Sequence, residues 1–383
     1  MLRLLERTKY VDHTFHECKD AVDGVIEVVR NSYYTELDIS SELLSNVILV
    51  DACFLLEVFF TNIGIMNSGI RSGDEDFMSA NEYKKILTSS GLRRDLALLE
   101  NQLPFFVLER LFEVICRCLE EPIGIQGISL PGIAFSIFKR DFNCHHKVFR
   151  LGTAKEHPNY RHLLDLISNY TRPSSSSSPD PALSPRPLPM SQQSPTVHLR
   201  NAKKLSEAGI HFEKAEENML LDIEFCSGVF RIPPLVINEC TESLLRNLMA
   251  FEHNSCNPED PTYPHDEYCA SHVFLMERLI SHKEDLDTME SKGIIINQMG
   301  GREDTYKIFH NISQNFVLKN FYFGELCSSI EAYCESRRNR CLLELRKKHL
   351  KSPWTTLSVV GGTILLIFTA IQTIYTVLSY LNR

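Results

Sequence analysis

The cysteines of this chain lack the spacing that a metal site or a disulfide framework requires. There are 12 of them, but no CxxC pair occurs, and the tightest pair, Cys116 and Cys118, lies on a strongly helical stretch. Residues two apart on a helix point in different directions and chelate poorly. The run NCHH, from Cys144 to His146, has no partner cluster. We expect reduced structural thiols, no metal, and a reducing compartment.

Catalytic signatures are also missing. The sequence contains no GxSxG, HExxH, DxDxxD, GxGxxG or Walker loop. The polar pair Glu100 and Asn101, in LLENQLPFF, is best explained as a cap or bridge where Pro104 kinks or splits a long helix. Asp222 and Glu224 are best explained as the outward face of a strand. We expect no catalytic residue and no cofactor, and the alternative is a hydrolase-like enzyme with an unrecognised site.

The overall charge argues against nucleic-acid binding. The net charge is −9 over 383 residues, whereas a nucleic-acid binder needs surplus positive charge. The first 20 residues have a charge every few positions and no apolar h-region, so we expect no signal peptide. Hydrophobic residues make up 43% and charged residues 23%, which is typical of a globular protein.

Ionisable charge disappears entirely near the C-terminus. From Leu357 to Leu381 there is no Asp, Glu, Lys, Arg or His, and thirteen residues are Leu, Ile, Val or Phe. As a helix this stretch spans roughly 37 Å, enough to cross a bilayer core of ~30 Å. The thirteen apolar residues favour insertion by roughly 4–8 kcal/mol, and threonine hydroxyls can bond back to helix carbonyls. The sequence therefore predicts a transmembrane tail anchor, and the alternative is a buried core helix.

The flanks of this segment predict its orientation. Several basic residues precede it and only Arg383 follows, so the positive-inside bias predicts that the large domain lies in the cytoplasm. We expect single-pass anchoring at the plasma membrane. The opposite topology would make Asn169 and Asn311 glycosylation acceptors. The predicted anchor residues are Trp354, Leu357, Ile364, Phe368, Ile371, Tyr375 and Leu381, and the basic flank is Arg337, Arg338, Arg340, Arg346, Lys347, Lys348 and Lys351.

A Ser/Pro-rich stretch divides the rest of the chain. Between Pro173 and Pro195 there are seven prolines and eight serines in 23 residues, which predicts an exposed linker or long loop. We expect an N-terminal helical region at 1–172, the linker at 173–196, a C-terminal part at 197–352 and the anchor at 353–383.

Periodicity predicts a mainly α fold, a helical globular body with one small β-hairpin and a C-terminal transmembrane helix. SELLSNVILVDACFLLEVFF is apolar nearly all round and predicts the central core helix, while Asp51 and Glu57 argue against a second membrane span there. The alternation in LLDIEFCSGVFRI predicts the hairpin, ending at Pro233 and Pro234. Thr241 is the expected N-cap of the next helix.

Six collinear motifs resemble one plant family. They are VDACFLLEVF, RDLALLENQLPFFVLERLF, KLSEAGIHFE, LLDIEFCSGVFRIPPLVINECTESLLRNLMAFE, KGIIINQMGG and SPWTTLSVVGGTILLIFTAIQTIY. The chain resembles the plant proteins of the domain of unknown function 247 family from about residue 10 to its end. The resemblance implies a C-terminal membrane helix, no established enzymatic activity and, in some grass members, a part in pollen–pistil self-recognition.

The expected function is that of a membrane-anchored, non-catalytic plant protein in protein–protein recognition or signalling. Its partners are membrane lipid, through the C-terminal helix, and one or more unidentified proteins.

Overall fold

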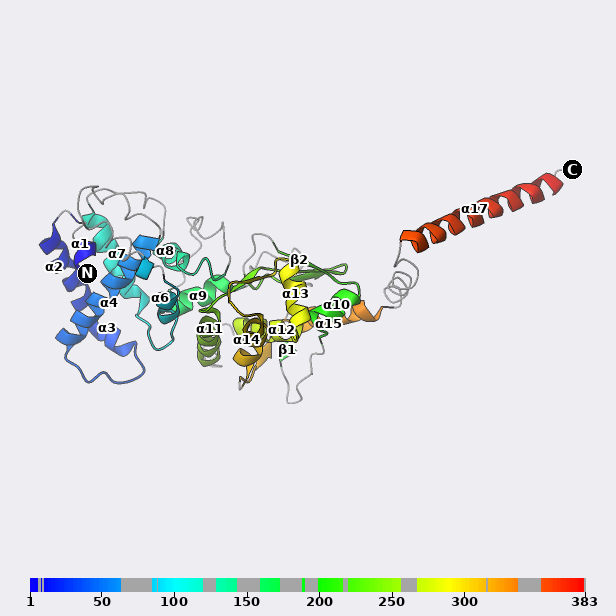
Figure 1. The fold of residues 1–383 in the computed structure, drawn as a ribbon. Helices are drawn as coiled ribbons and strands as arrows, with labels where there is room; N and C mark the ends of the chain where they lie inside the picture. The colour runs from blue at the N-terminus through cyan, green and yellow to red at the C-terminus, as the bar shows by residue number, and fades with distance from the viewer. Residues whose placement is uncertain are drawn as a thin grey trace.

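The computed structural model describes residues 1–5, 8, 10–62, 85–87, 89–119, 129–142, 159–172, 188–189, 199–215, 220–255, 267–314, 316–336 and 353–381. Over these residues the chain is mainly helical with a small amount of sheet, as the sequence predicts. Figure 1 shows an elongated body, with the N-terminal helices at one end and the last helix, α17, beyond the other.

In the part before the Ser/Pro-rich stretch, the described regular elements are helices, with one isolated β-bridge between Thr8 and Leu119. The helices are α1 (Leu2–Leu5), α2 (Val11–Asp23), α3 (Ile26–Asn31), α4 (Ser41–Asn62), α6 (Ser90–Leu96), α7 (Phe105–Cys118), α8 (Leu130–Ser136) and α9 (Leu163–Thr171).

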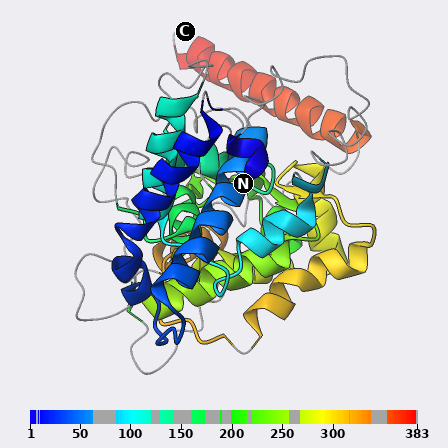
Figure 2. The same ribbon diagram turned by 90° about the vertical axis from the view of Figure 1, so that its left-hand side faces the viewer.

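Helix α4 is the central helix of this part, which confirms the sequence prediction. It contacts α1, α2, α3, α7 and α8, and Figure 2 looks onto this group of helices from the N-terminal end of the body. Ala52, Cys53, Leu56 and Phe59 of α4 are fully buried. Burial of large side chains of this kind stabilises a fold by about 1.5–3 kcal/mol each.

Proline 104 separates α6 from α7, as its missing N–H predicts. Asn101, although exposed, caps the end of α6, because its side-chain amide donates to the carbonyl of Asp95, at 3.0 Å. The residue that bridges the break is the next one, Gln102. The Gln102 amide donates to the carbonyls of Leu96, at 3.0 Å, and Leu98, at 2.6 Å. Its side-chain oxygen accepts the N–H of Leu164, at 2.9 Å. The predicted capping role is therefore confirmed for Asn101, and the bridge across the break is made by Gln102, which the sequence did not single out.

The part after the Ser/Pro-rich stretch mixes helices with short strands. Its elements are α10 (Ala202–Glu207), β2 (His211–Lys214), β3 (Glu224–Cys226), β4 (Val229–Ile232), β5 (Leu235–Ile237), α11 (Thr241–Ser255), α12 (Tyr268–Leu279), α13 (Lys283–Ser291), β6 (Ile295–Asn297), α14 (Arg302–Ser313), β7 (Asn320–Phe321), α15 (Gly324–Glu335) and α17 (Pro353–Leu381). Within the stretch itself, β1 (Leu188–Pro189) pairs antiparallel with β7.

The predicted hairpin is present as β3 and β4, which pair antiparallel. Ser227 and Gly228 at its turn have φ of 50° and 86°, as a type I′ turn requires. A side chain at Gly228 would meet the hydroxyl of Tyr333 on α15, so this turn also needs glycine for space. The hairpin continues into a sheet of order β2-β4-β3, in which β2 runs parallel to β4, and a second parallel pair joins β5 to β6.

Two local predictions around the hairpin are wrong. Asp222 is buried and precedes β3, so it is not on an outward strand face. Thr241 is the first residue of α11, and its hydroxyl donates to the carbonyl of Val236, at 3.3 Å, instead of capping the helix. The hydroxyl of Thr241 also accepts the N–H of Asn238, at 2.9 Å, a contact that helix periodicity does not reveal.

The two parts share one hydrophobic cluster, which extends from Leu4 to Cys334. Polar contacts join them as well. The N–H of Leu99 donates to the side chain of Asn247 on α11, at 2.8 Å. The guanidinium of Arg161 lies over the ring of Phe251, 4.8 Å from its centroid.

Candidate membrane anchor and the polar junction of the body

The predicted anchor segment forms one continuous helix. Helix α17 contains 29 residues, from Pro353 to Leu381, and Figure 1 shows it apart from the body. Five of the seven predicted anchor residues have described side chains, namely Leu357, Ile364, Phe368, Ile371 and Tyr375, and these are 48–77% exposed. Trp354 and Leu381 lie on the same helix, but their side chains fall outside the described ones.

No described side chain of α17 is buried. Every residue at 357, 358 and 361–375 is exposed, so the apolar positions do not form a stripe that packs on the body. Soluble proteins rarely expose a contiguous apolar surface larger than a few hundred Å². A helix that is hydrophobic all round is found either in a protein core or across a membrane.

Two threonine hydroxyl groups of α17 form hydrogen bonds inside the helix. Thr369 donates to the carbonyl of Leu365, at 2.7 Å, and Thr373 donates to the carbonyl of Thr369, at 2.8 Å. This confirms the predicted back-bonding, which lowers the cost of moving a threonine from water into hydrocarbon.

Length and mean hydropathy alone favour α4, and not α17, as a helix that could cross a membrane. Among the described residues, the helix that is long and apolar enough to cross a membrane is α4, with 22 residues and a mean hydropathy of 2.1, but 61% of its apolar window is buried in the body. The apolar part of α17 with described side chains, Gly361–Tyr375, is a shorter apolar helix in the same test. Because α4 is largely buried, it is a core helix in spite of its hydropathy. Any proposal that α17 binds a membrane therefore depends on the exposure of its side chains and on its lack of charge, and not on mean hydropathy.

The predicted basic flank lies at residues 337–351, outside the described residues. Its seven cationic side chains are known from the sequence alone. They fall between the end of α15 at Glu335 and the start of α17 at Pro353.

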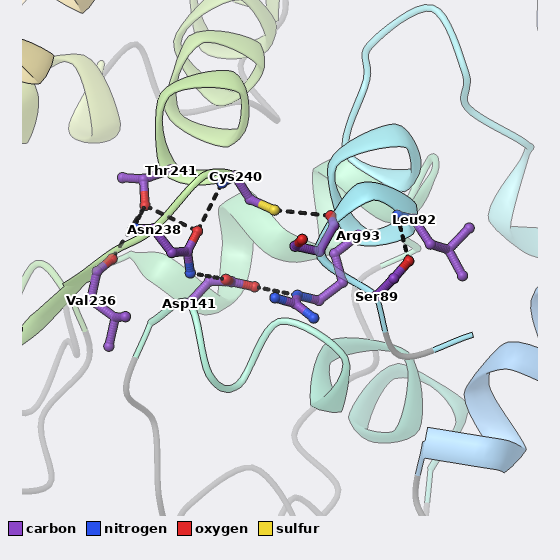
Figure 3. A network of polar contacts seen from close by, with 9 residues as sticks. Ser89, Leu92, Arg93, Asp141, Val236, Asn238, Cys240 and Thr241 are labelled. Carbon is purple, nitrogen blue, oxygen red and sulfur yellow. Dashed lines mark hydrogen bonds and ion pairs between the residues drawn. The ribbon is translucent and has the colours of Figure 1, made fainter. Parts of the chain in front are cut away.

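A buried polar network, which the sequence did not predict, joins the two parts of the body (Figure 3). The guanidinium Nε of Arg93, on α6, lies 3.1 Å from Oδ2 of Asp141, and the side chain of Asp141 is 2% exposed. The other oxygen of Asp141 accepts the side-chain amide of Asn238, at 2.7 Å. The Asn238 oxygen accepts the N–H of Cys240, at 2.8 Å. An ion pair from one part thus holds the turn between β5 and α11 of the other.

The chemistry of this network is that of a structural joint. The thiol of Cys240 donates to the carbonyl of Ser90, at 2.9 Å, and burial raises its pKa. A protonated thiol bound to a carbonyl is a poor nucleophile. Residues 93, 141 and 238 are far apart in sequence, so only a signal of spatial contact could have predicted the joint.

Two buried carboxylates fix the start of α12. Glu252 accepts the N–H groups of Cys269, at 2.9 Å, and Ala270, at 3.2 Å, and burial raises the pKa of Glu252 to about 8. Glu267 accepts the N–H of Lys319, at 2.6 Å, and lies 3.0 Å from Nδ1 of His253. Both carboxylates are bound to backbone or neighbouring side chains, an arrangement that orients α11, α12 and the approach to β7.

The described thiols that show clear pKa shifts all shift upward. Burial raises the pKa of Cys18 and Cys327 to about 12 and that of Cys53 and Cys116 to about 11. The thiolate is the reactive and metal-binding form, so these cysteines are chemically quiet at neutral pH. Among the residues described, no group of three or more His, Cys, Asp or Glu side chains is placed to hold a metal ion.

Comparison with known proteins gives a family. A family model described as a plant protein of unknown function matches residues 1–368. The chain is 28% identical to the UPF0481 protein At3g47200 of Arabidopsis thaliana, over 99% of this chain and 77% of that protein. It is 21% identical to the putative UPF0481 protein At3g02645 of the same plant, over 47% of this chain and 33% of that protein. No solved structure matches it.

Proposed function

The chain belongs to the domain of unknown function 247 family of plant proteins, and from that premise we propose that it is a non-catalytic recognition protein held on a membrane by α17. The body presents a binding surface to protein partners, and α17 localises the chain to the membrane. The proposal extends to a single-pass topology with the body in the cytoplasm, at the plasma membrane.

One observation carries the proposal. Helix α17 has no charged residue between Leu357 and Leu381, and each of its described side chains is exposed. Its thirteen Leu, Ile, Val and Phe residues favour insertion by roughly 4–8 kcal/mol. The back-bonded hydroxyls of Thr369 and Thr373 reduce the opposing cost. Transfer into lipid removes the apolar surface that the body leaves uncovered.

Two features support the cytoplasmic orientation. Seven basic residues precede α17 and one follows it, which is the bias expected of a cytoplasmic N-terminal flank. The side-chain amide of Asn169, one of the two sequon residues, donates to the carbonyl and to the carboxylate of Asp165, at 2.8 and 3.1 Å. A glycan on Asn169 would replace one of the two amide hydrogens that make these bonds, so it would break at least one of them at a half-buried position, and glycosylation there opposes this fold.

Protease protection tests the topology. We expect the body of the full-length chain to be digested when sealed microsomes from plant tissue are treated with protease from outside, because the body faces the cytoplasm. Glycosidase treatment of the same preparation should leave the mobility of the chain unchanged. Survival of the body until detergent is added, or a glycosidase-dependent shift, would contradict the proposed orientation.

The binding role is supported by the character of the polar groups. The junction of Arg93, Asp141 and Asn238 is buried and mutually hydrogen-bonded, and the shifted thiols are protonated at neutral pH. These buried groups stabilise the fold and are poorly suited to catalysis. We therefore assign the binding of partners to the exposed surface of the body.

A further inference from the structure

The N-terminal end of the body exposes an apolar stripe on its central helix. Leu43, Val47, Val50 and Phe54 of α4 are 37–52% exposed, although the rest of this helix forms the core. Their spacing of four, three and four residues places them on one face. It is also the spacing with which one helix receives the apolar side chains of another. The stripe extends for roughly 16 Å, or three turns.

The surroundings of the stripe are strongly acidic. Residues 11–62 contain ten Asp and Glu and two Lys and Arg, which gives this segment a net charge of −8. Both cations are used within the segment. Lys19 lies 2.9 Å from Asp23, and Arg30 donates to the carbonyls of Leu37 and Ile39 and lies 3.8 Å from Glu27.

Four acidic residues border the stripe, and partial burial raises the pKa of one of them, Asp51. Asp51 lies on the same face as Val47 and Phe54, and Glu42 adjoins Leu43, with Glu36 and Asp38 in the approach to α4. All four are exposed, and none of them forms an ion pair within the described part of the chain. An apolar stripe with an acidic border is complementary to a helix with an apolar stripe and a basic border.

We propose that the acidic face of α4, made of Leu43, Val47, Val50, Phe54 and Asp51, docks a basic amphipathic helix of a partner protein. The partner's apolar side chains fill the stripe, and its Lys or Arg side chains pair with Asp51 and the neighbouring carboxylates. A second copy of this chain that pairs face to face would bring two acidic faces together, and an anionic membrane surface would be repelled by the same charge. The proposal rests on the proposed recognition role but does not require the anchor.

Fluorescence anisotropy tests the docking directly, with the full-length chain in non-ionic detergent micelles. The probe is a fluorescein-labelled helical peptide of Leu and Lys, about 18 residues long, with leucines spaced four and three apart. One control peptide replaces each Lys by Glu, and another shuffles the Leu/Lys sequence so that its apolar stripe is lost. We expect saturable binding of the first peptide, weakened by salt, and at least about tenfold weaker binding of both controls.

Surface variants locate the site. Val47→Ser with Val50→Ser should weaken binding of the Leu/Lys peptide by about tenfold or more, and Asp51→Lys should weaken it and reduce its salt dependence. Matched controls are Val317→Ser, at an apolar residue 77% exposed, and Glu303→Lys, at an exposed residue of α14. Both controls should bind as the parent chain does. Circular dichroism of each variant establishes that the fold is kept.

Three results would overturn the proposal. Equal binding of the shuffled or the Leu/Glu peptide would remove its chemical basis. If the Val47→Ser, Val50→Ser variant bound the Leu/Lys peptide with unchanged affinity, the peptide would bind at a site other than the stripe. A dimer of the parent chain that this variant converts to a monomer in light scattering would identify a second copy as the occupant. Because the assay is done in micelles, none of these results depends on whether α17 anchors the chain.

Discussion

Helices α4 and α17 are both long and apolar, but the structure treats them in opposite ways. Helix α4 contains Asp51 and Glu57, packs against five other helices and is largely buried. Helix α17 has no charge from Leu357 to Leu381, and its described side chains are all exposed. Mean hydropathy does not separate a helix packed in the core from one left exposed, whereas the position of charge and the presence of packing partners do.

Transplanting each helix gives the largest expected difference. When fused to the same soluble carrier, residues 353–383 should insert into microsomes almost completely, whereas residues 41–62 should insert poorly. The reason is that a carboxylate at the helix centre costs about 2.5–3.5 kcal/mol. Glycosylation mapping of the inserted fraction measures both, and Asp51→Val should raise insertion of the α4 fusion. Equal insertion of the two fusions would remove the distinction between them.

Matched truncations sharpen the comparison in the full-length chain. Leu56→Ala should lower the free energy of unfolding of the body by about 2–5 kcal/mol, because Leu56 is fully buried. Leu366→Ala should leave it unchanged, because Leu366 is 73% exposed on a helix apart from the body. Urea titration followed by circular dichroism in micelles measures both values. A comparable loss in Leu366→Ala would mean that α17 packs against the body.

Low pH should reduce the stability of the body but should not change the membrane binding that we propose for α17. Burial lowers the pKa of His272, on α12, from 6.5 to about 4. Below pH 6.5 the unfolded chain therefore binds a proton that the folded chain excludes, and stability falls as pH decreases toward 4, by up to about 3 kcal/mol from this group. Unfolding free energies at several pH values should show a shallower acid loss in His272→Phe than in the parent.

We expect membrane binding through α17, if it is the anchor we propose, to show no comparable pH dependence. No Asp, Glu, His, Lys or Arg lies between Leu357 and Leu381, so the membrane-bound fraction should be the same at pH 7 and pH 5. A pH-dependent release would indicate that charged groups outside α17 hold the chain on the membrane.

The smallest expected effect concerns the threonines of α17. Thr369→Val with Thr373→Val removes two hydroxyls that already bond to the helix's own carbonyls. Insertion of the helix should therefore change by no more than about 1 kcal/mol. In the same glycosylation-mapping assay, Thr369→Asp serves as the contrast and should reduce insertion sharply. Similar behaviour of the two variants would show that residue 369 lies outside the hydrocarbon core.

The sequence predicted the features that depend on local pattern. The all-round apolar run of α4, the break at Pro104 and the turn at Ser227 and Gly228 each have a signal within a few residues. Each of these predictions is confirmed. The assignment to the plant family, made from collinear motifs, is confirmed as well.

Features that depend on distant partners could not be predicted in the same way. Strands β2, β5 and β6 are three or four residues long, too short for periodicity, and β6 pairs with a strand almost 60 residues away in sequence. Burial of Asp222 and the joint of Arg93, Asp141 and Asn238 likewise require knowledge of which segments meet. The exposed stripe of α4 was hidden because the same run of residues supplies the core.

Alkaline carbonate extraction of membranes tests the central claim most directly. Plant cells expressing the full-length chain, or a chain ending at residue 352, are lysed, and their membranes are washed at high pH and centrifuged. We predict that the full-length chain remains in the pellet and that the shortened chain moves to the supernatant. Recovery of the full-length chain in the supernatant would contradict the account of α17 as a membrane anchor.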